Sequence, residues 1–331
     1  MTLMAEIPAD GRDHILRLRD GRHLCSRLYG AEGPAAPAVF ALHGTPGSRL
    51  KFVSTDEPAK ALGLRVIAPD RWGYGLSDVP ENPSLRLYAE DLAQLATALG
   101  LARFAVLGVS GGGPYAAAVA ALLGAKVTAL ALVSPVGQIA GQASAHDMSR
   151  FHQFCFLKLP HLPGIIDHVF RMFRFGLNHS PDVAMKLAML RAARADRQLM
   201  NIDKVRQRLS ATFIEGLKPG AQGPVIDLQL FGNKWDVPLA AICAPARLWI
   251  GTEDQNVPFN AALALGRQVP GCALTELAGA GHLWVAVHYD EVLDWLAETL
   301  DLQPVRIMDG LTDGSADGAS DDHLYRPRER N

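Results

Sequence analysis

The sequence has few features typical of secreted, metal-binding or membrane-spanning proteins. It has no run of about 18 apolar residues that could cross a membrane, and its first residues lack the basic and then apolar pattern of a signal peptide. The cysteines are few and widely separated, with no CxxC pair or other metal-ligand spacing. They are Cys25, Cys155, Cys243 and Cys272. We therefore expect a cytoplasmic chain with reduced thiols, no bound metal and no membrane span.

The sequence also lacks a strong excess of charge of either sign. Its 32 lysines and arginines nearly balance 34 aspartates and glutamates, for a formal net charge of −2. No overall field therefore draws the chain to nucleic acid or to an anionic membrane, and we expect a small-molecule substrate and no nucleic-acid partner. No sequence feature calls for a cofactor, and none indicates the oligomeric state. With 331 residues, 49% of them hydrophobic, the chain is long enough for one large core.

Apolar segments alternate with helical patterns along much of the chain. Residues 14–30 alternate on both sides of Asp20-Gly21, which predicts a hairpin. Strands that are apolar on both faces then alternate with helices, which predicts a mostly parallel sheet covered by helices on both faces. The alternation lapses over residues 136–238, which we interpret as an insertion, and it then resumes. We expect a core of 14–135 and 239–302, and a disordered tail over the Asp-, Gly- and Ser-rich 303–331.

The segment GVSGGGPYA, residues 108–116, places one serine among four glycines at a strand-to-helix junction. Its GxSxG pattern predicts a sharp turn that lifts the Ser110 hydroxyl above the sheet. Side chains at Gly108 and Gly112 would collide with the neighbouring strand and helix. A phosphate-binding loop is the alternative, but the segment has no lysine and Pro114 lacks an amide proton. We interpret Ser110 as a nucleophile.

A serine nucleophile needs a histidine base and normally a carboxylate that orients it. His282, in GAGHL, follows the last predicted strand and should reach the same sheet edge as Ser110; His288 is the alternative. The carboxylate candidate is Asp254, just past another strand, with Glu253 as the alternative. His43, the first residue of HGTPGS at the end of the third predicted strand, is expected to brace its loop.

Four stretches together resemble the α/β-hydrolase superfamily, in the chain order nucleophile, acid, histidine. They are HGTPGS, DRWGYGLSD, GVSGGG, and GTEDQNVP with GAGHL, and the resemblance covers roughly residues 20–300. It implies that the amides of Thr45, which follows His43-Gly44, and of Gly111 form the oxyanion hole. It also implies that Asp70, Gly73 and Gly75 shape a loop, and that the insertion is a helical cap.

The predicted cap is rich in phenylalanine and in positive charge. Residues 151–175 hold six of the twelve phenylalanines, and we expect some rings to line an apolar substrate pocket, although packing between helices is an equal alternative. The pocket candidates are Phe151, Phe154, Phe170 and Phe173. The cap's basic residues are expected mostly on solvated helix faces, of which RAARADRQ (191–198) is typical. A role at a membrane surface or toward an acidic substrate is the alternative.

The resemblance admits several reactions, so the function has to be argued from the site. The leading hypothesis is a carboxylic ester hydrolase in which Ser110 forms an acyl-enzyme, His282 transfers protons and Asp254 orients the imidazole. HGTPGS is also partly similar to the HGGPG of proline iminopeptidases, whose cap carboxylates bind an ammonium group; here Glu215 is the cap's only glutamate. Carbon–carbon hydrolase and thioesterase activities use the same three residues. A ligand-binding receptor without turnover is the alternative outside the enzymes.

Overall fold

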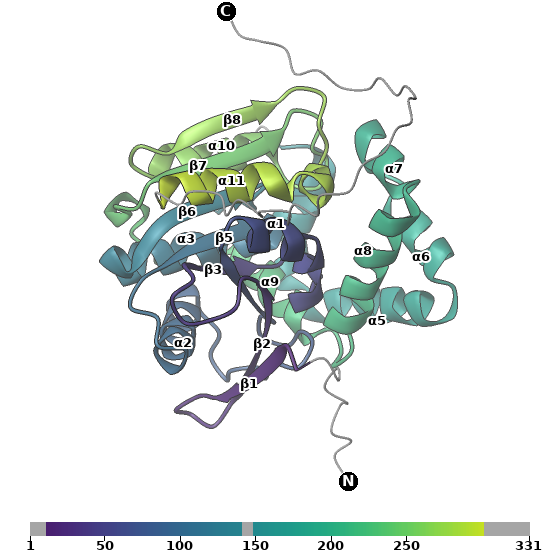
Figure 1. Ribbon diagram of the computed structural model, residues 1–331. Helices are drawn as coiled ribbons and strands as arrows, with labels where there is room; N and C mark the ends of the chain where they lie inside the picture. Colours follow the sequence, from purple (N-terminus) through teal and green to yellow (C-terminus); the bar gives the residue numbers. More distant parts are fainter. Residues whose placement is uncertain (1–10, 141–147, 301–331) are drawn as a thin grey trace, which may run out of the picture.

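The computed structural model describes residues 11–140 and 148–300, so the predicted tail lies outside the described residues. An eight-stranded sheet forms its centre, in the order β1-β2-β4-β3-β5-β6-β7-β8 (Figure 1). The strands β3 to β8 all run parallel to one another. At one edge, β1 and β2 form an antiparallel ribbon, and β2 also pairs antiparallel with β4. The predicted mostly parallel sheet and its N-terminal hairpin are therefore confirmed. The strands are β1 Asp13–Arg17, β2 His23–Gly30, β3 Ala38–Leu42, β4 Arg65–Pro69, β5 Phe104–Val109, β6 Val127–Val133, β7 Ala246–Gly251 and β8 Ala273–Leu277.

Helices cover both faces of this sheet because successive strand residues point to opposite sides. In β3, Phe40 and Leu42 pack on the side of α2, α3 and α10, whereas Val39 and Ala41 pack on the side of α1 and α11. Both sides are apolar, which explains the continuous hydrophobic strands in the sequence. The core helices are α1 Asp56–Ala61, α2 Leu85–Ala98, α3 Gly113–Leu123, α10 Phe259–Gln268 and α11 Tyr289–Thr299.

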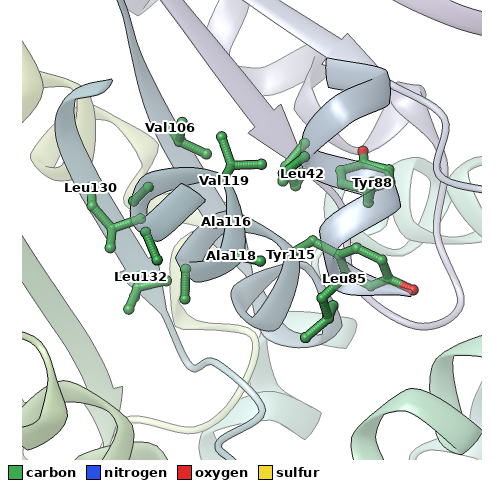
Figure 2. Packing of buried hydrophobic residues seen from close by; sticks show 14 of the residues in the cluster. Leu42, Leu85, Tyr88, Val106, Tyr115, Ala116, Ala118, Val119, Leu130 and Leu132 are labelled. Carbon is green, nitrogen blue, oxygen red and sulfur yellow. The ribbon is translucent and has the colours of Figure 1, made fainter. Parts of the chain in front are cut away.

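Helix α3 packs closely against the middle of the sheet and sets the position of the residues that precede it. Its alanines are buried, Ala116 and Ala118 completely, and these small side chains let the helix approach the strands (Figure 2). Tyr115 packs edge-on against Tyr88 of α2, with ring centroids 4.7 Å apart. The start of α3, and with it the turn that contains Ser110, is thereby held at the end of β5.

In the part of the chain that the structure describes, six helices lie between β6 and β7, and most of them stand beside the core (Figure 1). An apolar cluster that includes Leu177, Met185 and Met200 packs the helices of residues 163–216 together, and Leu283 of the core joins it. The last of the six, which carries Phe231, packs against the main core instead. These helices are α4 Arg150–Gln153, α5 Pro163–His179, α6 Pro181–Ala188, α7 Arg194–Met200, α8 Asp203–Gly216 and α9 Gln222–Gly232. Shorter 3₁₀ or π turns are η1 Arg49–Thr55, η2 Ser110–Gly112, η3 Gly124–Lys126, η5 Phe154–Lys158, η6 Leu159–His161, η7 Leu239–Ala241 and η8 Trp284–Val287. We call residues 148–238 the cap.

Candidate active site

Ser110 lies on a strained turn between β5 and α3. Its backbone φ is 54°, in the left-handed region that non-glycine residues rarely adopt. The turn needs glycines around it because the chain passes close to its neighbours: a Cβ on Gly112 would lie 2.2 Å from the carbonyl oxygen of Leu42, and one on Gly108 would lie 2.6 Å from Cβ of Ala116. The Ser110 side chain is therefore held at the sheet edge, partly exposed, with the N-terminus of α3 behind it.

His282 connects Ser110 to a buried carboxylate. Its Nε2 lies 3.0 Å from Oγ of Ser110, and its Nδ1 lies 2.7 Å from Oδ2 of Asp254. With the proton on Nδ1, the ring donates to Asp254 and accepts from the serine hydroxyl. Burial by itself would raise the pKa of Asp254. The charge and hydrogen bond of His282 have the opposite effect, as do hydrogen bonds from the amides of Val257 and Asn256, and the net result is a lowered pKa. Asp254 is thus held ionised beside the imidazole.

The alternatives considered from the sequence lie elsewhere. Glu253 is exposed, whereas Asp254 is only 8% exposed and faces His282. The ring of His288 stacks on Trp284, with centroids 4.7 Å apart. His43 is fully buried; it bonds the carbonyl of Gly44 through Nδ1 and accepts from the Arg71 amide through Nε2. Burial, followed by the nearby Arg71 charge, lowers the pKa of His43 well below 6.5, so this ring stays neutral in its loop.

The loop after β3 touches the turn after β5, next to Ser110. A Cβ on Gly44 would lie 3.0 Å from Cβ of Ser110, and one on Gly111 would lie 2.2 Å from Oγ1 of Thr45. Phe231 of α9 reaches the same point, with its Cζ 3.2 Å from the Cβ position of Gly111. Thr45 and Gly111, the residues expected to bind an oxyanion, are therefore brought together beside the serine.

A buried ion pair anchors this loop to the cap, which the sequence analysis did not anticipate. Asp227 of α9 accepts hydrogen bonds from Arg71, from the Thr45 hydroxyl, and from the hydroxyls of Tyr74 and Tyr115. Arg71 also donates to the backbone carbonyls of the loop after β3. Arg71 and Asp227 are 0% and 1% exposed. A lone aspartate in an apolar stretch, PVIDLQL, is the only sequence signal for this cluster.

A second cap carboxylate contacts the histidine loop directly. Asp196 of α7 accepts hydrogen bonds from the backbone amides of His282 and Leu283, at 2.9 and 2.7 Å, and is 1% exposed. Its pKa is raised by burial, which the two amides offset only in part. The arginines of RAARADRQ are exposed, as expected for basic residues on a solvated face, but Asp196 between them turns toward the core.

The four phenylalanines predicted to line a pocket lie in two kinds of environment. Phe151 and Phe154 are 39% and 47% exposed, and Arg191 stacks on the ring of Phe151. Phe170 and Phe173 pack against the apolar cluster of the cap, where Phe173 also meets Phe213. Their role in a pocket stays a prediction. Phe231, which the sequence analysis did not single out, is the ring beside the Ser110 turn.

Within residues 11–140 and 148–300, no three histidine, cysteine, aspartate or glutamate side chains cluster in a way that could hold a metal ion. No helix in that same part of the chain is long and apolar enough to span a membrane.

The chain is similar to known proteins over most of its length. It is 29% identical to the magnesium-chelatase 30 kDa subunit of Rhodobacter capsulatus over 80% of this chain and 88% of that protein. It is 25% identical to the 2-hydroxymuconate semialdehyde hydrolase of Pseudomonas putida over 81% and 87%. The solved structure of an α/β hydrolase fold protein from Nakamurella multipartita matches with a TM-score of 0.65 and 26% identity, over 87% and 98%. The family model described as alpha/beta hydrolase fold matches residues 37–289. With this sheet, these helices and that match, the chain belongs to the α/β hydrolase fold family.

Proposed function

We propose that the protein is a serine hydrolase that cleaves a carboxylic ester of a small, largely apolar substrate. The observation that carries this proposal is the continuous hydrogen-bonded series Ser110, His282, Asp254. A hydroxyl is a weak nucleophile at neutral pH, and an imidazole held by an ionised carboxylate is the arrangement that activates it. The strained, glycine-lined turn serves the same end, because it exposes the hydroxyl to a substrate.

In this mechanism Ser110 Oγ attacks the acyl carbon while its proton passes to Nε2 of His282. The bond to the alcohol oxygen then breaks as His282 returns that proton to it, leaving an acyl-enzyme. Water attacks the acyl carbon next while one of its protons passes to Nε2 of His282. The bond from the acyl carbon to Ser110 Oγ then breaks, His282 returns the proton to Oγ, and the acid leaves. The amides of Thr45 and Gly111 would bind the oxyanion, a contribution of about 10²- to 10³-fold in kcat per donor in comparable sites.

Carbon–carbon bond cleavage is the second candidate, because the similar proteins include hydrolases of that kind. Besides the Pseudomonas putida enzyme, the 2-hydroxy-6-oxononadienedioate/2-hydroxy-6-oxononatrienedioate hydrolase of Paraburkholderia xenovorans is 27% identical over 85% of this chain. The same serine and histidine would serve both reactions, so the distinction depends on the substrate. Turnover of 2-hydroxymuconate semialdehyde in preference to simple esters would favour this candidate.

The aminopeptidase alternative fits the cap less well. Such an enzyme needs a free cap carboxylate to bind the ammonium group of its substrate, and Glu215 is the cap's only glutamate. Glu215 is paired with the buried Arg49, at 2.7 Å, which also pairs with Asp13 and Asp70. The two buried cap aspartates, Asp196 and Asp227, already hold other partners. A carboxylate committed to an internal ion pair has little capacity to bind a substrate cation.

The alternative outside the enzymes is a ligand-binding protein that does not turn over a substrate. The similarity to a chelatase subunit is the observation that supports this alternative. Labelling with a fluorophosphonate probe separates the two. We expect the wild type to be labelled at Ser110 and the Ser110→Ala variant to stay unlabelled. A folded wild type that resists labelling would remove the hydrolase proposal.

The substrate class is tested with one panel measured on the same preparation. It contains p-nitrophenyl esters of increasing acyl length, an aryl thioester, prolyl and other aminoacyl anilides, and 2-hydroxymuconate semialdehyde. We expect the highest kcat/KM for an ester. Preference for the anilides, the thioester or the semialdehyde would replace the ester assignment by the corresponding alternative and leave the three-residue site in place.

A further inference from the structure

The loop that carries His282 is built around a carboxylate that belongs to the cap. Asp196 lies on α7, 86 positions earlier in the chain, and its two oxygens accept from two consecutive amides, those of His282 and Leu283. The preceding residue has to be glycine, because a Cβ on Gly281 would lie 2.3 Å from Oδ1 of Asp196. Three successive loop residues therefore form a cradle for this one side chain.

Backbone hydrogen bonds also hold the loop on either side of this contact: the Ala280 carbonyl accepts from the Glu253 amide, and the Leu283 carbonyl accepts from the Ala286 amide. The side chain of Leu283 packs into the apolar cluster of the cap, with Leu177, Met185 and Met200. The loop therefore meets the cap through both a polar and an apolar contact. Since the imidazole of His282 has to stay within hydrogen-bond distance of Ser110 and Asp254 at once, a shift of its backbone would break one of these bonds.

We propose that Asp196 is a positioning residue that makes activation of Ser110 depend on the seating of the cap on the core. When α7 is docked, the carboxylate holds the His282 backbone where both ring nitrogens find their partners. When α7 moves away, two backbone amides lose their acceptor and the loop relaxes. The inference rests on the proposed hydrolase function, and it adds that the cap controls the histidine as well as covering the site.

The first test replaces Asp196 by Ala and by Asn. Neither variant can accept from both amides, because alanine has no acceptor and asparagine has a single oxygen and an NH₂ group that would face an N–H. We expect kcat for a short p-nitrophenyl ester to fall about 10- to 100-fold, the usual consequence of displacing a catalytic group by about 1 Å, while KM changes less than about threefold. Gly281→Ala crowds the same contact from the loop side, and we expect it to lower kcat in the same way.

Two control variants separate positioning from a general loss of cap stability. Ile166→Ala removes a fully buried side chain of α5 that lies outside the cluster containing Leu283. Asp203→Asn removes an exposed cap carboxylate, 76% of whose side chain is accessible. We expect both to keep kcat within about threefold of the wild type, even where Ile166→Ala lowers Tm as much as Asp196→Ala does. Equal losses of kcat in Ile166→Ala and Asp196→Ala at matched Tm would overturn the inference.

Two further measurements keep the inference testable if the Asp196 variants fold poorly. In the wild type, hydrogen exchange should show the amides of His282 and Leu283 protected, and Gly281→Ala should speed the exchange of both; unprotected amides would overturn the proposal. The rate of fluorophosphonate labelling tests the hydrolase function and the positioning role of Asp196 separately. An unlabelled wild type contradicts the hydrolase function, whereas a labelled wild type with equally fast labelling of Asp196→Ala contradicts only the positioning role.

Discussion

Removal of the Asp227 carboxylate should destabilise the protein more than removal of any exposed cap charge. In Asp227→Ala, Arg71 stays fully buried without its counter-ion, and the hydroxyls of Thr45, Tyr74 and Tyr115 lose their acceptor. An ion pair broken in this way costs about 3–5 kcal/mol. Each buried hydroxyl left without an acceptor adds about 1–3 kcal/mol, although these terms are not additive.

We therefore expect the free energy of unfolding to fall by at least about 4 kcal/mol, a large share of the roughly 5–15 kcal/mol typical of a folded protein. The measurement is urea denaturation followed by circular dichroism and tryptophan fluorescence, with Asp203→Ala as the control for an exposed cap aspartate. We expect the control to lose less than about 0.5 kcal/mol, as is usual for surface substitutions.

A double-mutant cycle tests the physical reason for this loss. Arg71→Leu combined with Asp227→Leu removes both charges, so no unpaired ion remains in the core. The double variant should therefore lose less stability than the two single variants added together, by more than about 1 kcal/mol. Additivity within about 0.5 kcal/mol would refute the coupling, and a loss below about 1 kcal/mol in Asp227→Ala would refute the whole estimate.

The remaining predictions concern the acid, the turn and the cap. Asp254→Asn should lower kcat by orders of magnitude, because the imidazole takes the wrong tautomer, while Glu253→Gln should change kcat less than about tenfold; the reverse order in steady-state kinetics would move the acid to Glu253. The pKa of Asp254 is lowered on folding, so its contribution to stability is present above its unfolded value of 3.8 and is lost as the pH falls through the folded value. The difference in unfolding free energy between wild type and Asp254→Asn should accordingly shrink in acid, and a difference that grows there contradicts the ionised carboxylate. Gly112→Val should cost about 1–3 kcal/mol from overpacking or misplace Ser110, as measured by denaturation and ester turnover; a stable, fully active variant would contradict the close approach to β3. If cap rings line the substrate pocket, at least one of the six phenylalanine-to-alanine variants in residues 151–175, such as Phe154→Ala or Phe173→Ala, should change the ester preference. We expect the ratio of kcat/KM for long esters to kcat/KM for short esters to fall more than about fivefold. Six unchanged ratios would leave these rings with packing roles only.

Much of the core could be predicted from the sequence because its signals are local. Apolar runs on both faces of a strand, helical spacing between strands and the Asp20-Gly21 hairpin depend only on residues close in the chain. The three residues of the candidate site could be predicted from local signals as well. Ser110, Asp254 and His282 each come just after a strand, and the carboxyl ends of parallel strands meet at one edge of the sheet. The choice between Asp254 and Glu253 still needed the structure, because adjacent residues point in different directions.

The sequence by itself therefore determined the sheet, the glycine-rich turn at Ser110 and the set of residues that can meet at the edge of the sheet. Only the tertiary structure decided how the cap contributes to that site. Asp196 and Asp227 are single acidic residues within helical patterns, and their partners His282 and Arg71 lie 86 and 156 positions away in the chain. Whether such a residue faces solvent or pairs in the core depends on how helices from the insertion pack on the sheet. No short-range pattern encodes that packing, because it results from many distant contacts formed at once.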